Sequence, residues 1–191
     1  MMDNGLKYGL VTRVLHWGMA ILLIYQLGGV VAGLALGETP LTEAWGRGHK
    51  PAGFILFVLA VVRALWGLLN LSRRPKLHEG LVGKLSLVGH LALYALVLAV
   101  PTIALIRQYG SGRPFEPFGI TIMQGGHDKI EWMTKLGGDW HGELGWVLLV
   151  AIVGHLVMAL VHHFVFKDDT LKRMAAQSIA SGGLTSWHFV L

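Results

Sequence analysis

Four long apolar runs separated by polar connectors dominate the hydrophobic pattern of this chain. They cover residues 14–36, 50–69, 85–106 and 141–166. Each run approaches or exceeds the roughly 20 residues that an α-helix needs to cross a hydrocarbon core about 30 Å thick. The pattern predicts an all-α membrane protein, in which residues 1–175 form a four-transmembrane-helix bundle. Residues 176–191 are predicted to form a tail, in which His188 is a surface residue.

The first apolar run also resembles a signal peptide, because small residues near Ala32–Ala35 could form a cleavage site. However, the run is longer than the apolar core of about 7–15 residues that signal peptides carry. It also contains His16. We therefore interpret it as a retained transmembrane helix.

Prolines and one long connector bear on the helix boundaries. Pro51 either opens the second helix or bends a helix that begins near Thr42, and the sequence does not choose between these. Pro101 predicts a kink near the outer end of the third helix. The connector over residues 107–139 is rich in Gly and has no clear period. It predicts a loop that caps the outer side of the bundle.

The composition agrees with a membrane protein and removes several kinds of cofactor site. Hydrophobic residues make up 53% of the chain and charged residues 14%, against about 25% charged in soluble domains. The net charge of +5 needs no nucleic-acid partner, because basic cytoplasmic loops produce the same balance. Cysteine is absent, which excludes disulfides, thiolate-ligated iron–sulfur clusters and covalent c-type haem. Histidine, with ten copies, is the remaining ligand type.

The distribution of basic residues predicts the orientation in the membrane. Nine Lys and Arg residues lie on the side that holds both termini, and six lie on the other: Lys7, Arg13, Arg73, Arg74, Lys76, Lys84, Lys167, Lys172 and Arg173, against Arg47, Lys50, Arg107, Arg113, Lys129 and Lys135. Because cytoplasmic loops carry the excess of positive charge, we expect a multi-pass protein of the bacterial inner membrane with both termini in the cytoplasm.

The fourth apolar run carries two histidines on one helix face. His141 and His155 are fourteen residues apart. At about 100° and 1.5 Å per residue, their side chains project in nearly the same direction and lie about 21 Å apart along the axis. They would lie near opposite sides of the membrane. Such residues can be satisfied by neighbouring helices, but buried ionisable residues in membranes are usually functional.

Two other histidines match these depths. With the N-terminus inside, His16 in the first run lies near the cytoplasmic surface, as does His155. His49, at the start of the second run, lies near the outer surface with His141. Four imidazoles at two depths suit two haems stacked across the bilayer, with His16 and His155 on the inner iron and His49 and His141 on the outer iron.

Three further polar residues lie within the predicted helices. Arg63 follows His49 by fourteen residues, and its guanidinium could bind a haem propionate or extend to the lipid headgroups. His90 and Tyr94 are one turn apart in the third run. They could ligate haem, bind a propionate, contact a quinone head group or only support the site by hydrogen bonds. His90 also lies at a depth where it competes with His155 for the position opposite His16.

Several short strings carry a family resemblance. They are LHW at 15–17, VVRALW around Arg63, GHLALY with His90 and Tyr94, GRPFEPFGI in the outer connector, WH at 140–141, and HHFVFKDDTLKRM from His162, which is the most specific. From about Arg13 to Met174, the chain resembles the bacterial cytochrome b561 family of small four-helix membrane proteins.

This resemblance implies a cofactor set and an activity. It implies two non-covalent b-type haems with bis-histidine ligation by His16, His155, His49 and His141. It also implies single-electron transfer from a donor outside the membrane to the quinone pool, with ubiquinone as the acceptor. Superoxide is one donor ascribed to the family. The protein is then an oxidoreductase of the respiratory chain, whose partners are membrane lipid, quinone and an unidentified electron donor.

Two other functions compete with this interpretation. The first is a cytochrome b subunit that anchors a larger redox complex, for which the outer connector could bind a partner subunit. The second is a histidine-lined metal transporter. Such a transporter would need carboxylates within its helices, and the predicted runs contain only Glu143, near one end. Histidines divided between two depths also cannot form one metal site.

Overall fold

The computed structural model describes residues 2–5, 7–75 and 80–175. The predicted tail over residues 176–191, with His188, lies outside the described residues. Within the described part the elements are α1 (Leu10–Leu36), α2 (Pro40–Leu69), the 3-10 turn η1 (Leu71–Arg73), α3 (Gly80–Gly110), the 3-10 turn η2 (Pro117–Gly119), α4 (Glu131–Phe164) and α5 (Thr170–Met174). The prediction of an all-α fold with four membrane-spanning helices is confirmed, since α1, α2, α3 and α4 are each long and apolar enough to cross a membrane.

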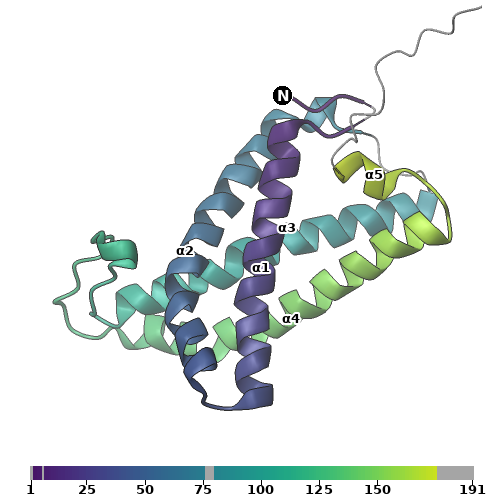
Figure 1. The fold of residues 1–191 in the computed structure, drawn as a ribbon. Coiled ribbons are helices and arrows are strands. Elements are labelled where there is room, and N and C mark those ends of the chain that lie inside the picture. The colour runs from purple at the N-terminus through teal and green to yellow at the C-terminus, as the bar shows by residue number, and fades with distance from the viewer. Residues whose placement is uncertain (1, 6, 76–79, 176–191) are drawn as a thin grey trace, which may run out of the picture.

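The four long helices form two antiparallel hairpins. α1 packs along α2, and α3 packs along α4, while α2 also contacts α3. In Figure 1 the α1–α2 hairpin crosses in front of the α3–α4 hairpin. We call the end of the bundle where α1 begins and α4 finishes the N-terminal end. The opposite end, with residues 111–130 between α3 and α4, is called the loop end.

The second helix begins earlier than its apolar run. Thr39 is the N-cap, because its hydroxyl accepts a hydrogen bond from the Thr42 backbone N–H while the Thr42 side chain bonds back to Thr39. Pro40 occupies the first helical turn, where its missing N–H costs nothing. α2 then continues through Pro51 to Leu69. Of the two alternatives for Pro51, the structure has the one in which this residue lies inside a longer helix.

The connector between α3 and α4 is shorter than the sequence predicted. α3 extends to Gly110 and α4 begins at Glu131, so residues 107–110 and 131–139 are helical and not part of the loop. The reason is tight packing between these two helices. A Cβ at Gly110 would collide with Met133, and a Cβ at Gly137 would collide with Arg107. Glycines that suggest a loop are here the contact points of a helix pair.

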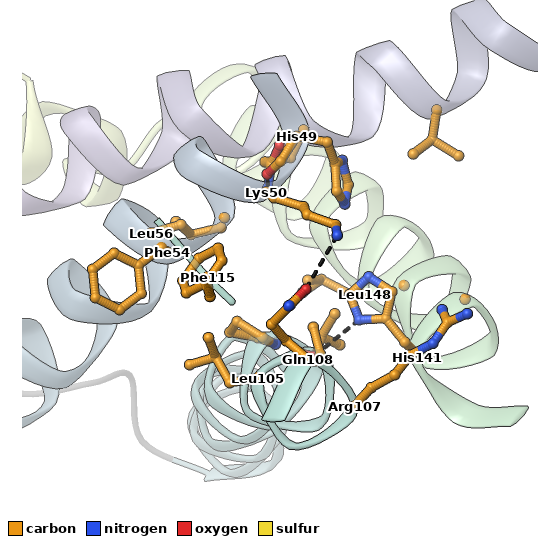
Figure 2. Close-up of a pocket in the computed structure, with 18 of the residues that line it drawn as sticks. His49, Lys50, Phe54, Leu56, Leu105, Arg107, Gln108, Phe115, His141 and Leu148 are labelled. Carbon is orange, nitrogen blue, oxygen red and sulfur yellow. Dashed lines mark hydrogen bonds between the residues drawn. The ribbon is translucent and has the colours of Figure 1, made fainter. Parts of the chain in front are cut away.

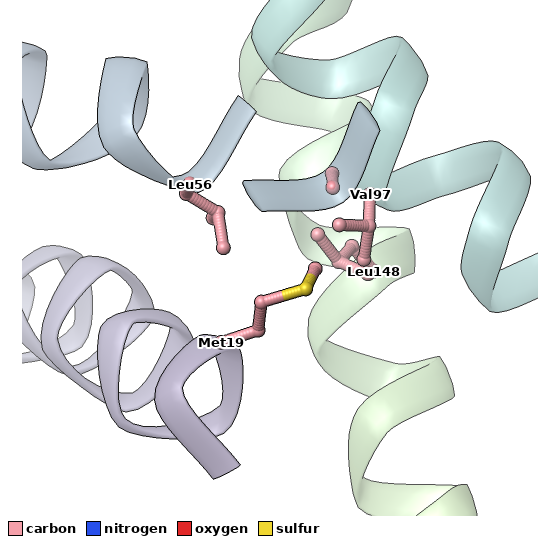
Figure 3. Packing of buried hydrophobic residues seen from close by; sticks show 5 residues of the cluster. Met19, Leu56, Val97 and Leu148 are labelled. Carbon is pink, nitrogen blue, oxygen red and sulfur yellow. The ribbon is translucent and has the colours of Figure 1, made fainter. Parts of the chain in front are cut away.

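A small apolar core holds the two hairpins together at mid-height. Its buried members are Met19 from α1, Leu56 and Ala60 from α2, Val97 from α3 and Leu148 from α4 (Figure 3). Many other large apolar side chains on all four helices are exposed, as expected where lipid and not protein covers them. The core therefore forms one layer between the two ends of the bundle.

Candidate functional site

Two predicted histidines meet at the loop end. His49 of α2 and His141 of α4 have ring centres 6.1 Å apart and ring planes at 89°. Both line a cavity of about 850 Å³, in which their side chains lie next to one another (Figure 2). Because the two residues come from different hairpins, the crossing of the hairpins brings them together.

Neighbouring groups orient this loop-end pair. The Nδ1 of His141 is 3.0 Å from the Val100 carbonyl oxygen, and because a carbonyl only accepts, Nδ1 carries the proton and Nε2 is left to bind a metal. The side-chain amide of Gln26 donates to the His49 carbonyl at 3.0 Å. Gln26 is buried, and its Oε1 has no hydrogen-bond partner among the described residues. The sequence offered no local signal for Gln26.

The second pair of predicted histidines meets at the N-terminal end. His16 of α1 and His155 of α4 have ring centres 6.3 Å apart and ring planes at 77°. His90 of α3 also lies near this pair, with its ring centre 5.4 Å from that of His155. The Nδ1 of His90 donates to the Ser86 carbonyl at 2.6 Å. The described part of the structure has no ring contact between His16 and His90.

The other two predicted polar residues also lie at the N-terminal end. The Arg63 guanidinium is 5.8 Å from the ring centre of Tyr94, within the range of a cation–π contact. Arg63 is also close enough to His16 and His155 to interact with both electrostatically. Its Nη1 is buried without a hydrogen-bond partner in the described part of the chain. The structure thus brings five of the predicted residues (His16, Arg63, His90, Tyr94 and His155) to one end.

The cavity at the loop end has a basic rim. Among its lining residues are Lys50, Arg107, Arg113, Lys129 and Lys135, together with the carboxylate of Glu131. Three of the lysines have partners: Lys129 pairs with Glu131 at 2.9 Å, Lys135 with Asp139 at 2.7 Å, and Lys50 donates to Gln108 at 3.1 Å (Figure 2). Within the described residues, Arg107 and Arg113 have no carboxylate in ion-pair distance. The mouth of the cavity therefore has an excess of positive charge.

Comparison with known proteins assigns the chain to a family. The profile of the prokaryotic cytochrome b561 family matches residues 7–176. The chain belongs to this family. It is 31% identical over 183 residues to cytochrome b561 homolog 2 of Escherichia coli strain K12, covering 93% of this chain and 96% of that protein. It is 28% identical over 172 residues to the probable superoxide oxidase CybB of Yersinia pestis, covering 88% and 95%. This b561-family cytochrome is a multi-pass membrane protein of bacterial type.

Members of this family bind haem b, and both histidine pairs fit such a group. Metal–imidazole bonds are about 2 Å long, as at zinc. Two such bonds end to end, with roughly 1.1 Å from each nitrogen to its ring centre, put the ring centres about 6 Å apart. The observed separations are 6.1 Å and 6.3 Å. The cavity of about 850 Å³ beside the loop-end pair lies within the range of about 300–1,000 Å³ for ligand sites.

The string HHFVFKDDTLKRM forms the turn from α4 into α5. The buried His162 donates from Nδ1 to the Asp168 carboxylate at 2.6 Å, and the Thr170 N–H donates to the same carboxylate at 2.9 Å. Burial alone would raise the pKa of Asp168, but these hydrogen bonds outweigh it and hold the pKa well below its usual range. Arg13 and Trp17 donate to backbone carbonyls at the end of α5, at 2.8 and 3.0 Å. The string thus ties α5 to the start of α1.

Proposed function

We propose that this cytochrome holds two b-type haems and passes single electrons across the membrane, from a donor at the loop end to quinone. His49 and His141 hold the haem at the loop end, and His16 and His155 hold the haem at the N-terminal end. The observation that carries the proposal is the presence of two histidine pairs at opposite ends of the bundle, each at the ring separation that one metal ion requires. The geometry of each pair supports non-covalent, bis-histidine binding.

The protein's own residues define what each centre does. Each histidine pair would hold one haem through both imidazoles, and the bound haem would supply one-electron chemistry. Val100 fixes the tautomer of His141, and Gln26 fixes the backbone at His49. Such hydrogen bonds set the basicity and orientation of the ligands. The apolar layer around Leu148 lies between the two histidine pairs.

The rim of the loop-end cavity supports an anionic electron donor. Unpaired cations such as Arg107 and Arg113 attract anions and raise their local concentration. Superoxide is a small anion, and the Yersinia pestis relative is named a probable superoxide oxidase. In this reaction two superoxide anions would release two molecules of oxygen and two electrons. One quinone would take both electrons with two protons to become quinol.

The distribution of basic residues supports the proposed orientation. The N-terminal end, which carries more Lys and Arg in its connectors, is then cytoplasmic, and the loop end faces outward. The described residues contain no group of three or more His, Asp or Glu side chains placed to hold one metal ion. This finding counts against the metal transporter. An anchor subunit of a larger redox complex is the other alternative, and co-purification of a soluble redox partner would favour it.

The haem content of the purified protein tests the proposal directly. We expect visible bands of low-spin haem b, about two haems per chain, and complete extraction of the colour by acid–acetone, because no cysteine forms a thioether link. A ratio near one haem per chain would contradict the two-site proposal. Colour that stays with the protein after extraction would contradict non-covalent binding.

Electron transfer is tested separately in proteoliposomes. With superoxide generated outside vesicles that contain ubiquinone, quinol should form only when the loop end faces outward. Protein with the opposite orientation serves as the control, and a protease that cleaves the exposed connector reports which orientation is present. If the haems can be reduced by another donor but the protein does not consume superoxide, the superoxide part of the proposal is refuted.

A further inference from the structure

Arg74 lies beside the predicted Arg63 and Tyr94, although it follows α2 in the connector. Its guanidinium turns back onto α2 at Gly67, which is buried. A Cβ at Gly67 would be 2.5 Å from Arg74 Nη2 and 3.6 Å from the Tyr94 hydroxyl oxygen. The absence of a side chain at Gly67 therefore gives the guanidinium its place. Arg63 is one helical turn earlier on the same face of α2, so two guanidinium groups adjoin one tyrosine.

Both arginines have buried donors that are not satisfied. Nη1 of Arg63 and Nε of Arg74 have no hydrogen-bond partner among the described residues. Buried polar groups nearly always have a partner, and an unsatisfied one points to a missing water, ion or ligand. Arg63 Nη1 therefore points to an acceptor that the described residues do not supply, whereas Arg74 Nε faces the equally unpartnered Asp3 Oδ2 at 3.8 Å.

Asp3 forms a long ion pair with Arg74. Its side chain is fully buried, and its Oδ1 accepts hydrogen bonds from the Gly9 N–H and the Thr12 hydroxyl, both at 2.7 Å. Its Oδ2 is 3.8 Å from Arg74 Nε, which is too long for a hydrogen bond. Within the described residues, Asp3 is the one carboxylate in ion-pair distance of either arginine. One acid beside two guanidinium groups leaves an excess positive charge.

We propose that Arg74 and Arg63 together bind the propionate carboxylates of the haem at the N-terminal end, and that Asp3 is the positioning residue for Arg74. The inference rests on the proposed haem at His16 and His155. Arginine suits this task because its planar fork pairs with both oxygens of a carboxylate. Lipid phosphate offers similar chemistry, but the unpartnered Nη1 of Arg63 is buried. That burial favours a carboxylate attached to the haem itself.

The first test measures the reduction potentials of both haems in Arg74→Gln. Reduction adds negative charge to a haem, and a nearby cation stabilises the reduced form. We expect the reduction equilibrium of one haem to weaken by roughly tenfold, or about 59 mV for one electron. Arg63→Gln should lower the potential of the same haem. Arg74→Lys, which keeps the charge but loses the fork, should cause a smaller shift.

Arg73→Gln is the matched control. Arg73 is the neighbouring residue, is exposed and contacts the Met2 sulfur, so its loss removes the same charge from the same connector. It should change neither potential. If Arg74→Gln also changes neither potential, or lowers both equally, the inference is wrong.

The second test removes the charge from the ligand. The haem-free wild type and Arg74→Gln are each reconstituted with haem b or with haem dimethyl ester, whose propionates are uncharged. With haem b we expect the wild type to bind more tightly than Arg74→Gln, and with the dimethyl ester we expect the two proteins to have equal haem affinity at the N-terminal end, because no carboxylate remains for the guanidinium to bind. A difference that persists would assign Arg74 to a lipid phosphate or to a structural role, and would overturn the inference.

The outcome also separates this inference from the proposed function. Fewer than two haems in the wild-type protein would contradict the proposed function, and this inference with it. Two haems in the wild type, with reduction potentials that Arg74→Gln does not change, would contradict this inference alone. Haem content is measured on every variant, so a fall in folded protein is not mistaken for a shift in potential.

Discussion

Replacing His155 by alanine tests the pairing at the N-terminal end. His16 and His155 have ring centres 6.3 Å apart, close to the roughly 6 Å that two metal–imidazole bonds impose. His90 and His155 are 5.4 Å apart, which is too short for a metal ion between them. Their closeness instead fits a second side chain beside the ligand. We therefore expect His155→Ala to remove one axial ligand and His90→Ala to remove none.

The expected effect is a change of about one haem per chain. Without His155, the iron at this end keeps one imidazole, so its haem becomes high-spin or is lost during purification. The haem-to-protein ratio should fall from about two towards one, and the low-spin band should lose about half of its intensity. The loop-end pair, His49 and His141, lies on the far side of the apolar core and should keep its haem.

The assay compares His155→Ala with His90→Ala in the same membranes. Haem is counted by the pyridine haemochrome spectrum, and spin state is read from the visible spectrum of each variant. His90→Ala should retain two low-spin haems, with at most a shift in one potential. If His90→Ala loses a haem while His155→Ala keeps both, then His90 and not His155 faces His16, and the argument from ring separation fails.

Three further predictions concern the scaffold of the site. Gly137→Leu should destabilise the protein in detergent by about 1–3 kcal/mol, because the new side chain would collide with the facing turn of α3. Gly138 has open space around it, so Gly138→Leu should leave thermal stability unchanged. Asp168→Asn should lower the free energy of unfolding by about 1.5 kcal/mol, because the hydrogen bond from His162 to a charged carboxylate is lost. Since the pKa of Asp168 is lowered in the folded protein, this stabilisation should be complete above about pH 4 and should disappear in thermal melts as the pH falls further. Gln26→Leu should shift the potential of the loop-end haem alone, and equal shifts of both haems would contradict its place beside that pair.

Much of the site followed from helical spacing. Residues fourteen apart share a face of a helix, so His141 and His155 could be placed at two depths without coordinates. The antiparallel order of the helices then assigned His16 and His49 to their partners. The structure brings the same residues into ring contact at 6.1 and 6.3 Å. This part was predictable because it depends on local geometry and on the direction of each helix alone.

The remainder depends on contacts between helices, which leave little trace in one sequence. Gly110 and Gly137 suggested a loop, but each allows a close approach between α3 and α4. Arg74 belongs to a basic stretch on which the predicted orientation depends, and nothing in its neighbours in the sequence shows that its guanidinium turns back onto α2. Asp3 and Gln26 likewise act through partners that are distant in sequence. Their roles required the packed structure.

If the two histidine pairs hold haems as proposed, the apolar core between them explains why two centres are needed. Leu148 is seven residues from His141 and seven from His155, so the core lies about 10 Å along α4 from each ligand. A hydrocarbon layer about 30 Å thick excludes ions because a charge loses its hydration there. An electron that moves between two fixed centres avoids that cost, since neither the donor nor a proton enters the layer. The positive rim at the loop end would then attract an anionic donor. The two arginines at the other end would bind the carboxylates of a bound cofactor. The division of this chain into two charged ends around one apolar layer is the arrangement that such a transfer requires.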